Sequence, residues 1–548
     1  MAETQGQFHV RVYDQLKGAR GPLENYWQDL TYLGMPRLAY ITRIKNMGDR
    51  LPSDVYNSTA ILVNAYFGAG MQAYISSPQS KWFGIVIKDR SLMNKRNVLN
   101  YCKDTEDVLY GMINNSNFYQ EDVEGYQTLG CIGTDILYAE KDWEEDLRFD
   151  CLPVENVLVI QDSHGRVNRI YMEYEFDASQ AIDKFGLGAV GKKVEEVFVK
   201  GDYNTKFKYI FCVFPRAVYD QRKRDSKNMP FTALWIDKER KVEVKEGGFK
   251  RFPFFVSRFA KGKGGAYGYS PEMNVWSDIS MLNQIEYTNV LAYQLSVAPP
   301  MEIPDEAFLR PFDLNPWGRN IKVSGMSNEH ITPIITGSRP DAGEKYIERK
   351  ERRISQAFYN DLFIMLEQMG DKTAFEVNIR NNQRMQLLGS ACGNIMRDKL
   401  SKVVGFTYDI AAELDKLPPL PPELRGQEYE IIYLSPLARA QRSLELNNMQ
   451  QGMGIIGQFA QAQIAAGERA SVLDNIDFDE AVKVVGDITN FAPRIIRDDQ
   501  EVESLREGKQ QEQAAAAQLQ MMQQGAEAAQ VATQADKNIA ETQTAGVK

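Results

Sequence analysis

A glycine-rich basic segment, residues 186–193 (GLGAVGKK), has the spacing at which backbone N–H groups cradle phosphates in nucleotide-binding loops. Two features disagree with that chemistry. Lys193 occupies the place of the serine or threonine that would hold magnesium, and the preceding segment, DASQAIDKF, has a helical pattern where a phosphate loop follows a buried strand. The segment is better interpreted as a turn between a helix and a strand, and we predict no ATP site.

Carboxylate groups are clustered at residues 143–146 (WEED) and 476–480 (IDFDE). Such clusters suit magnesium or calcium, but the second lacks the glycine of an EF-hand loop, and solvated acidic turns explain both. His9, His164 and His330 are far apart in the sequence, and the five cysteines include no C-x-x-C pair. We therefore predict no metal site, no cofactor, no disulfide framework and no histidine-based catalysis.

Basic side chains are concentrated in residues 347–355 (IERKERRIS), where Arg349, Arg352 and Arg353 belong to one helical pattern. Glu348 precedes Arg352 by four residues, so pairing within the helix explains part of the pattern. A solvated or intersubunit helix face is the simplest interpretation of the rest.

A second glycine-rich basic stretch, residues 262–271 (GKGGAYGYSP), could contact nucleic acid, but it does not follow a strand into a dinucleotide-binding unit. A flexible connection into the next helix is the preferred interpretation. The whole chain has a net charge of −10 and a pI of about 5.2, which is the wrong sign for a protein that binds DNA tightly by neutralising its phosphates.

Hydrophobic periodicity predicts an α+β fold. Residues 8–117 show apolar residues at helical spacing, and residues 132–259 change to strand patterns separated by Gly, Asp and Asn turns. Mainly antiparallel strands are expected there. The apolar runs that we expect to form strands include residues 157–160, 169–176, 208–214 and 252–259, and turns are expected at residues 163–165 and 246–248.

Two long helices are predicted in the second half of the chain. Ser270 as N-cap and Pro271 at the first helical position begin the first helix, which extends to Ala298 before two prolines. Residues 299–340 are rich in Pro, Gly and Asn, and a second helix is expected from Asp341 to Gln368.

Further elements are predicted after that helix. The residues from Gly370 to Thr373 break the pattern, and the expected elements that follow are a helix over 374–417, a strand over 429–434 and helices over 436–466 and 477–490. The Gln- and Ala-rich residues 509–548 are interpreted as a disordered tail, with a solvent-exposed helix as the alternative. No apolar run reaches the length of about 18 residues that a membrane span needs, and no signal peptide is evident at the N-terminus, so neither spanning nor secretion is expected.

Several blocks, taken in order, resemble the head-to-tail connector (portal) proteins of short-tailed double-stranded DNA bacteriophages. The most distinctive is QEYEIIYLSPLARAQR (residues 427–442), in which a strand enters a helix through Ser435 and Pro436. The other blocks are residues 10–30, 77–87 (SPQSKWFGIVI) with 116–138, 266–287 (AYGYSPEMNVW and beyond) and 372–383. The signature residues of these blocks are Trp82, Phe83, Tyr267, Gly268, Ser270, Pro271, Ser435, Pro436, Arg439, Gln441 and Arg442.

The resemblance implies a structural protein that catalyses no reaction. It implies a homo-oligomeric ring, twelve subunits in the family, at one capsid vertex, through which double-stranded DNA is packaged, retained and ejected without sequence specificity. The implied partners are the terminase packaging motor, capsid and scaffolding proteins, and the tail adaptor or nozzle and internal core proteins. The implied location is the virion, with the host cytoplasm during assembly, and no membrane is involved.

The family's architecture also implies domain boundaries. The expected regions are a wing (1–269), a first stem helix (270–298), a clip (299–340), a second stem helix (341–369), a tunnel loop (370–377), a long helix and return strand of the wing (378–435), crown helices (436–508) and the tail (509–548). Lys372 and Thr373 are expected in the tunnel loop, and one or two of Arg349, Arg352 and Arg353 could also face the DNA channel. The alternatives are a tail or adaptor structural protein and, less favoured, a nucleotide-using DNA-packaging enzyme.

Overall fold

The computed structural model describes residues 3–361 and 389–465 apart from short gaps, and only scattered residues between 471 and 522. The gaps are 44–47, 49, 51, 90–91, 93–94, 221–222, 224, 263–264, 306–314, 316–317, 324–331, 334–340, 390, 425, 427–428 and 434–435. The chain divides into two compact units. The larger unit consists of Met1–Ile85, Asp104–Pro418 and Ile431–Gln441, and the smaller unit of Val86–Lys103, Pro419–Glu430 and Arg442–Lys548.

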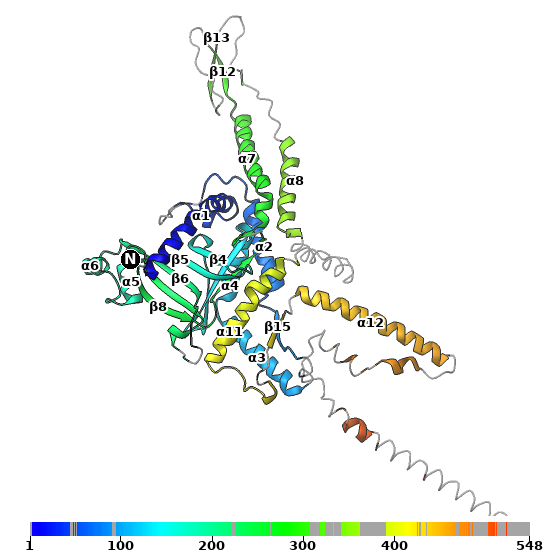
Figure 1. Cartoon of the computed structure of the whole chain (residues 1–548). Coiled ribbons are helices and arrows are strands. Elements are labelled where there is room, and N and C mark those ends of the chain that lie inside the picture. The colour runs from blue at the N-terminus through cyan, green and yellow to red at the C-terminus, as the bar shows by residue number, and fades with distance from the viewer. Residues whose placement is uncertain are drawn as a thin grey trace, which may run out of the picture. The chain divides into compact units, whose positions relative to one another are not determined.

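The larger unit contains an antiparallel five-stranded sheet in which the strands follow their sequence order (Figure 1). Its strands are β4 (Val157–Gln161), β5 (Val167–Asp177), β6 (Lys206–Pro215), β7 (Phe231–Asp237) and β8 (Val242–Phe249). A second sheet has the order β3 (Leu147–Cys151), β2 (Thr134–Lys141) and β9 (Phe254–Arg258). The expected strands at 157–160, 169–176, 208–214 and 252–259 are confirmed, and the fold is α+β.

Helices α1 (Gln5–Gly34) and α4 (Phe118–Cys131) pack against these sheets, and α2 (Thr59–Ile75) packs against α4. The chain also forms α3 (Arg96–Asn115). Helix α1 begins at a capping box in which the Thr4 and Gln7 side chains satisfy each other's backbone N–H groups. Its Val10 and Tyr13 pack on one part of the five-stranded sheet, and its Trp27 and Leu30 join the main core.

Two sequence expectations for the sheet region were wrong. Residues 246–248 lie within strand β8 and do not form a turn, because the second glycine serves a close approach: a Cβ atom on Gly248 would lie 2.1 Å from the Ser226 carbonyl oxygen. Residues 186–193 connect α5 (Ala178–Phe185) to a second helix, α6 (Lys192–Lys200), where a strand was expected.

Helix α7 (Pro271–Val297) begins at Ser270 and Pro271, as its sequence predicted. The chain then forms β12 (Met301–Asp305), which pairs in parallel with β13 (Arg319–Val323) and antiparallel with β14 (Thr332–Pro333). Helix α8 (Asp341–Ala357) packs beside α7 (Figure 1). It ends before Gln368, where the sequence placed its end, and Tyr359 has a left-handed φ of 59°.

The remaining described elements follow a gap at residues 362–388. A π-helical turn, η5 (Met396–Leu400), continues into α11 (Ser401–Glu413). The expected strand is present as β15 (Tyr429–Tyr433), which pairs with β1 (Phe83–Ile87), and the expected helix as α12 (Pro436–Ala465). The short elements are η1 (Pro36–Leu38), η3 (Val154–Asn156), η4 (Ser226–Asn228), β10 (Ala260–Lys261), β11 (Gly268–Tyr269), η6 (Pro422–Leu424) and η7 (Ser471–Asn475).

The smaller unit has an apolar cluster of its own. Ile87, Val98, Tyr101, Cys102 and Leu424 are buried together, with Leu92 and Tyr429 packed against them. The described part of α12 leaves Ile455, Phe459 and Ile464 exposed. The helix expected over 477–490 and the Gln- and Ala-rich tail lie almost wholly outside the described residues.

Candidate functional site

The signature residues before α7 fix the start of that helix. The Ser270 hydroxyl accepts a hydrogen bond from the Met273 N–H at 3.0 Å, which satisfies a donor in the first turn. Gly268 donates its N–H to the Thr134 hydroxyl at 2.8 Å. A Cβ atom on Gly268 would lie 2.2 Å from the Gly133 carbonyl oxygen, so only glycine fits at this crossing of two backbones.

Tyr267 connects the same segment to α1. Its ring packs edge-on against Trp27 with centroids 5.0 Å apart, and its hydroxyl accepts a hydrogen bond from buried Arg20 at 3.1 Å. Arg20 also donates to the carbonyl oxygens of Val154 and Val157, at 3.0 and 2.6 Å. One buried guanidinium thus ties α1, the β4 edge and the start of α7 together.

Trp82 and Phe83 are also structural. Both side chains are fully buried, and their backbone N–H groups donate to the Tyr110 hydroxyl, each at 2.5 Å. The late signature is only partly described. Ser435 lies outside the described residues, and Pro436, Arg439, Gln441 and Arg442 begin α12 with side chains that the structure does not describe.

Helices α7 and α8 are joined by a buried ion pair. Lys350 Nζ of α8 lies 2.5 Å from Asp278 Oδ1 of α7, and both side chains are less than one-fifth exposed. Next to this pair, the Tyr346 hydroxyl lies 3.4 Å from Met281 Sδ. The Thr59 hydroxyl of α2 donates to Glu351 of α8 at 3.1 Å, so the helix pair is anchored on the body.

The predicted channel candidates on α8 are exposed. Arg349, Arg352 and Arg353 all lie at the surface, and no ion pair within the described part of the chain involves them. The expected pair between Glu348 and Arg352 is therefore not formed. Lys372 and Thr373 fall in the undescribed residues 362–388, so their position stays a prediction.

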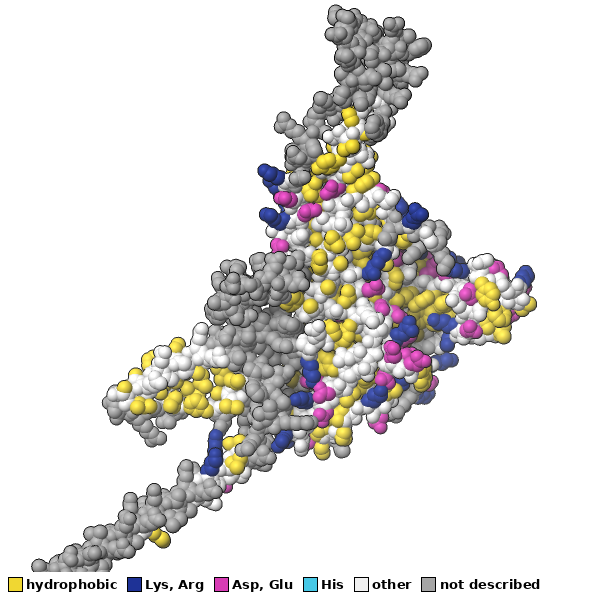
Figure 2. Space-filling view, turned by 180° about the vertical axis from the view of Figure 1, so that it is seen from behind, with side chains coloured by type: hydrophobic (Ala, Val, Ile, Leu, Met, Phe, Trp, Pro, Cys, Tyr) yellow, Lys and Arg dark blue, Asp and Glu magenta, His cyan; other side chains and the backbone are white. Residues whose placement is uncertain are grey.

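Helix α7 presents an apolar face to solvent. Figure 2 shows apolar side chains gathered on the described part of the two helices, with acidic and basic groups along one side of the pair and over the body. The exposed residues of this face are Tyr287 (37%), Val290 (41%), Tyr293 (48%) and Val297 (82%), whereas Met281, which is 44% exposed, lies beside Tyr346 of α8. Exposed apolar patches that extend along an element are typical of interaction surfaces.

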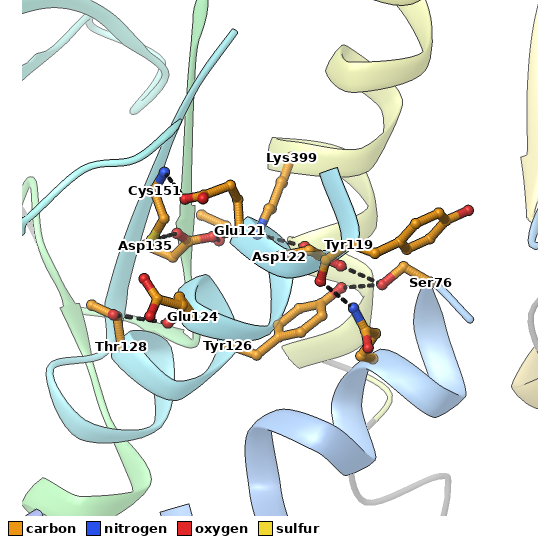
Figure 3. A network of polar contacts seen from close by, with 12 residues as sticks. Ser76, Tyr119, Glu121, Asp122, Glu124, Tyr126, Thr128, Asp135, Cys151 and Lys399 are labelled. Carbon is orange, nitrogen blue, oxygen red and sulfur yellow. Dashed lines mark hydrogen bonds and ion pairs between the residues drawn. The ribbon is translucent and has the colours of Figure 1, made fainter. Parts of the chain in front are cut away.

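Sequence reasoning missed a buried charge network that joins α4, β2 and η5 (Figure 3). Lys399, on the π-helical turn, is fully buried between Asp122 of α4 and Asp135 of β2, with Nζ–Oδ distances of 2.7 and 2.6 Å. Burial alone would lower the pKa of Lys399, but the two carboxylates more than offset this and raise it. The ammonium group is therefore charged in the folded protein.

Hydrogen bonds hold the two carboxylates of this network. The Ser76 hydroxyl donates to Asp122 at 2.5 Å, and the Ser257 hydroxyl donates to Asp135 at 3.3 Å. A Cβ atom on Gly125 would lie 2.6 Å from Asp135 Oδ1 and 2.8 Å from Lys399 Nζ, so glycine makes room for the charges. The network fixes α4, β2 and η5 to one another.

A buried titratable group lies in the first turn of α7. Glu272 is fully buried, and neither carboxyl oxygen has a hydrogen-bond partner among the described residues. Burial raises the pKa of Glu272 to about 8, which the neighbouring Cys131 thiol only partly offsets. This carboxyl group is thus mainly protonated at neutral pH.

The nucleotide-loop spacing at residues 186–193 has no phosphate-binding geometry. Gly186 ends α5 with a φ of 85°, and Gly191 caps α6. The space beside Gly191 is taken by Arg240, whose guanidinium donates to the Ala189 carbonyl oxygen at 3.1 Å. The loop is a connection between helices.

The acidic segment at residues 143–146 forms the turn between β2 and β3. Asp146 pairs with Lys416 at 2.6 Å, and the Asp142 carboxylate accepts hydrogen bonds from the Glu144 and Glu145 N–H groups. Residues 476–480 are mostly undescribed. In the described part of the chain, no three His, Cys, Asp or Glu side chains converge as a metal site, and no described helix is long and apolar enough to cross a membrane.

A pocket of about 450 Å³ opens beside the two sheets, lined by aromatic residues that include Tyr138, Tyr174 and Trp235. The Lys184 ammonium group lies 4.2 Å from the Trp235 ring centroid and occupies the position that a cationic ligand would take. Lys184 of α5 therefore already places a cation in this pocket.

Comparison with known proteins identifies the family of the chain. The family model described as "Bacteriophage head to tail connecting protein" matches residues 9–496. The "Portal protein" of Salmonella phage epsilon15 is 26% identical over 552 residues, which cover 99% of this chain and 97% of the relative. The "Probable portal protein" of Bordetella phage BPP-1 is 25% identical over 537 residues, or 96% of each chain. Because the family match extends over most of its length, the chain belongs to the bacteriophage head-to-tail connecting protein family.

Proposed function

We propose that this chain is the subunit of a portal ring, twelve copies closing one capsid vertex, through whose axis DNA is packaged, retained and ejected. The observation that carries the proposal, beside family membership, is the exposed apolar face of α7. This helix is covered by α8 on one side and still leaves Val290 and Tyr293 in solvent, so a neighbouring copy is the natural cover. A cyclic interface that closes would bury the same face in every subunit.

The regions of the portal architecture are assigned from the order of elements. The body before residue 270 corresponds to the wing, α7 and α8 to the two stem helices, and the strands β12, β13 and β14 to the clip. Residues 370–377 correspond to the tunnel loop, residues 378–435 to the return of the wing and residues 436–508 to the crown. The helix, small sheet, helix order supports the stem and clip assignments.

Positively charged side chains are proposed to touch DNA as it passes. Arg349, Arg352 and Arg353 are exposed and without ion pairs among the described residues, so their charges are available. Lys372 and Thr373 are assigned to the tunnel loop by their place between the two helical regions. Exposed contacts with phosphates are weak and screened by salt, which suits a duplex that must move.

A ring of this kind makes and breaks no bond, and a separate terminase motor supplies the energy for packaging. Capsid and scaffolding proteins would hold the ring during assembly in the host cytoplasm. The tail adaptor or nozzle and internal core proteins would bind it in the virion. A nucleotide-using packaging enzyme is disfavoured, because residues 186–193 are a helix connection filled by Arg240.

Native mass measurement and end-on electron microscopy of the purified chain test the proposal. The expected species has a mass near twelve times 62.3 kDa, with a central channel, beside rings of neighbouring size. A lasting 62.3 kDa monomer at micromolar concentration would refute it. An assembled tail or adaptor protein would instead give an image without the projecting pair of helices in each subunit.

A further inference from the structure

Basic side chains surround one carboxylate where the π-helical turn meets β9. Asp398 Oδ2 lies 2.8 Å from Lys261 Nζ and 3.8 Å from Arg258 Nη2, and Asp398 Oδ1 lies 3.0 Å from Arg397 Nε. Lys402 follows one helical turn later and forms no ion pair among the described residues. Positive charge thus exceeds negative charge in this cluster, although the chain as a whole carries −10.

The excess positive charge of this cluster affects the pKa of Lys402. Burial lowers the pKa of its ammonium group, Asp398 opposes this, and the nearby charges of Arg258, Lys261 and Arg166 lower it further. Arg166 is exposed on the turn before β5 and adds its guanidinium to the same region. A group that is repelled by three cations gains the most from an anion placed among them.

Arg258 is the buried member of the cluster, and a hydrogen bond holds its side chain in place. Its side chain is only 4% exposed, and its Nη2 donates to the Gly165 carbonyl oxygen at 3.0 Å. Its Nε is buried without a hydrogen-bond partner among the described residues. A buried donor left without an acceptor is costly, so the Arg258 guanidinium keeps unused hydrogen-bonding capacity within this cluster.

We propose that Arg258, Lys261, Arg397 and Lys402 form a binding site for a phosphate-type oxyanion. Guanidinium and ammonium donors gathered around Asp398 match the several oxygens of a phosphate group. Asp398 positions the cations and at the same time limits the affinity. The phosphate could belong to a DNA backbone or be a free phosphate, and the DNA source rests on the proposed portal function.

The test uses the assembled full-length protein and titrates inorganic phosphate by calorimetry at constant ionic strength. The double variant Arg397→Gln and Lys402→Met should weaken phosphate binding about tenfold, because each lost cation removes a charge-assisted hydrogen bond. Asp398→Asn should strengthen it, since the only carboxylate of the cluster is removed without loss of shape. Lys192→Met is the matched control, because Lys192 is exposed and distant from the cluster in sequence, and it should change nothing.

A second arm separates the two phosphate sources. Binding of a random-sequence DNA duplex is measured as a function of salt, and loss of one phosphate contact lowers the slope of log affinity against log salt by about one. A lower slope in the double variant assigns the site to the DNA backbone, and an unchanged slope with weakened phosphate binding assigns it to free phosphate. The site is refuted if the wild-type ring binds no phosphate, or if Asp398→Asn fails to strengthen binding. Native mass of the same samples reports ring formation separately, so failure of the site and failure of the proposed function are distinguishable.

Discussion

At the residue scale, Lys399 shows how a buried charge can hold distant parts of the chain together. It is paired with Asp122 and Asp135, and the bond to Asp135 connects residues 264 positions apart. No local pattern in the sequence could reveal this pairing, because an isolated Lys in the segment MRDKL has the appearance of a solvated residue. The buried network therefore had to be seen in the fold.

Lys399→Met should destabilise the protein by about 3–5 kcal/mol, because it leaves two carboxylates buried without their cation. The measurement is the denaturant midpoint of purified protein, followed by circular dichroism. The control is Lys250→Met. Lys250 is 59% exposed and its Nζ lies 3.8 Å from Asp409 Oδ1, which is long for an ion pair, so the change should alter stability by less than about 0.5 kcal/mol. Equal losses of stability in the two variants would show that the buried ion pairs of Lys399 stabilise the fold no more than the exposed pair of Lys250 does.

Glu272 makes a second residue-scale prediction, which concerns pH. In the folded protein its pKa is about 8, against an ordinary value of 4.5, so the folded state keeps a proton that the unfolded state loses. Stability from this group therefore falls as pH rises from 4.5 to about 8, by up to about 1.4 kcal/mol per pH unit, and is constant above that.

Glu272→Gln removes this titration and keeps the size of the side chain. Relative to wild type, the variant should gain stability steadily between pH 5 and pH 8, measured as the difference in melting temperature at a series of pH values. A constant difference over that range would mean that Glu272 is ionised in the folded protein.

At the scale of elements, local sequence signals predicted the structure correctly where it depends only on residues that are neighbours in the sequence. Ser270 and Pro271 predicted the start of α7, since capping depends on neighbouring residues only. The two glycines of β8 misled the prediction, because Gly248 is required by its close approach to the Ser226 carbonyl oxygen, a contact that the local sequence pattern does not reveal. The end of α8 at Ala357 was also missed, because no Gly or Pro marks it.

The α7 face carries the element-scale prediction. Val290→Asp should abolish rings or shift the mass toward 62.3 kDa, because it places a charge on the surface that a neighbouring copy would bury. Folding should be unaffected, since Val290 is 41% exposed in the single chain. Native mass spectrometry measures assembly, and circular dichroism measures folding.

The matched control is Val199→Asp on α6, where the same change is made at a valine that is 84% exposed. Rings should form normally in that variant. If Val290→Asp also forms normal rings, the α7 face is not the subunit interface, whatever the family membership implies.

At the scale of the whole molecule, the resemblance of several sequence blocks identified the family, although local patterns alone predicted only an α+β protein with two long helices. The assembled state could not come from one chain's periodicity, because an exposed apolar face has no partner within that chain. Charge does operate at this scale. A net charge of −10 per subunit, repeated around a ring, opposes lasting adhesion of DNA while single basic clusters can still touch it.

The final prediction concerns this balance. Assembled rings should bind a random duplex only weakly at physiological salt, with a dissociation constant of about 10⁻⁴ M or weaker, because few phosphates are neutralised and the ring repels the rest. Fluorescence anisotropy over a salt series measures it. A variant with Glu144→Lys and Glu145→Lys, two exposed residues of one turn, checks that the assay responds, since reducing the acidic charge should raise the affinity. Nanomolar binding by the wild-type ring would contradict a conduit through which DNA slides, because a duplex gripped that tightly would have to break many phosphate contacts at each step.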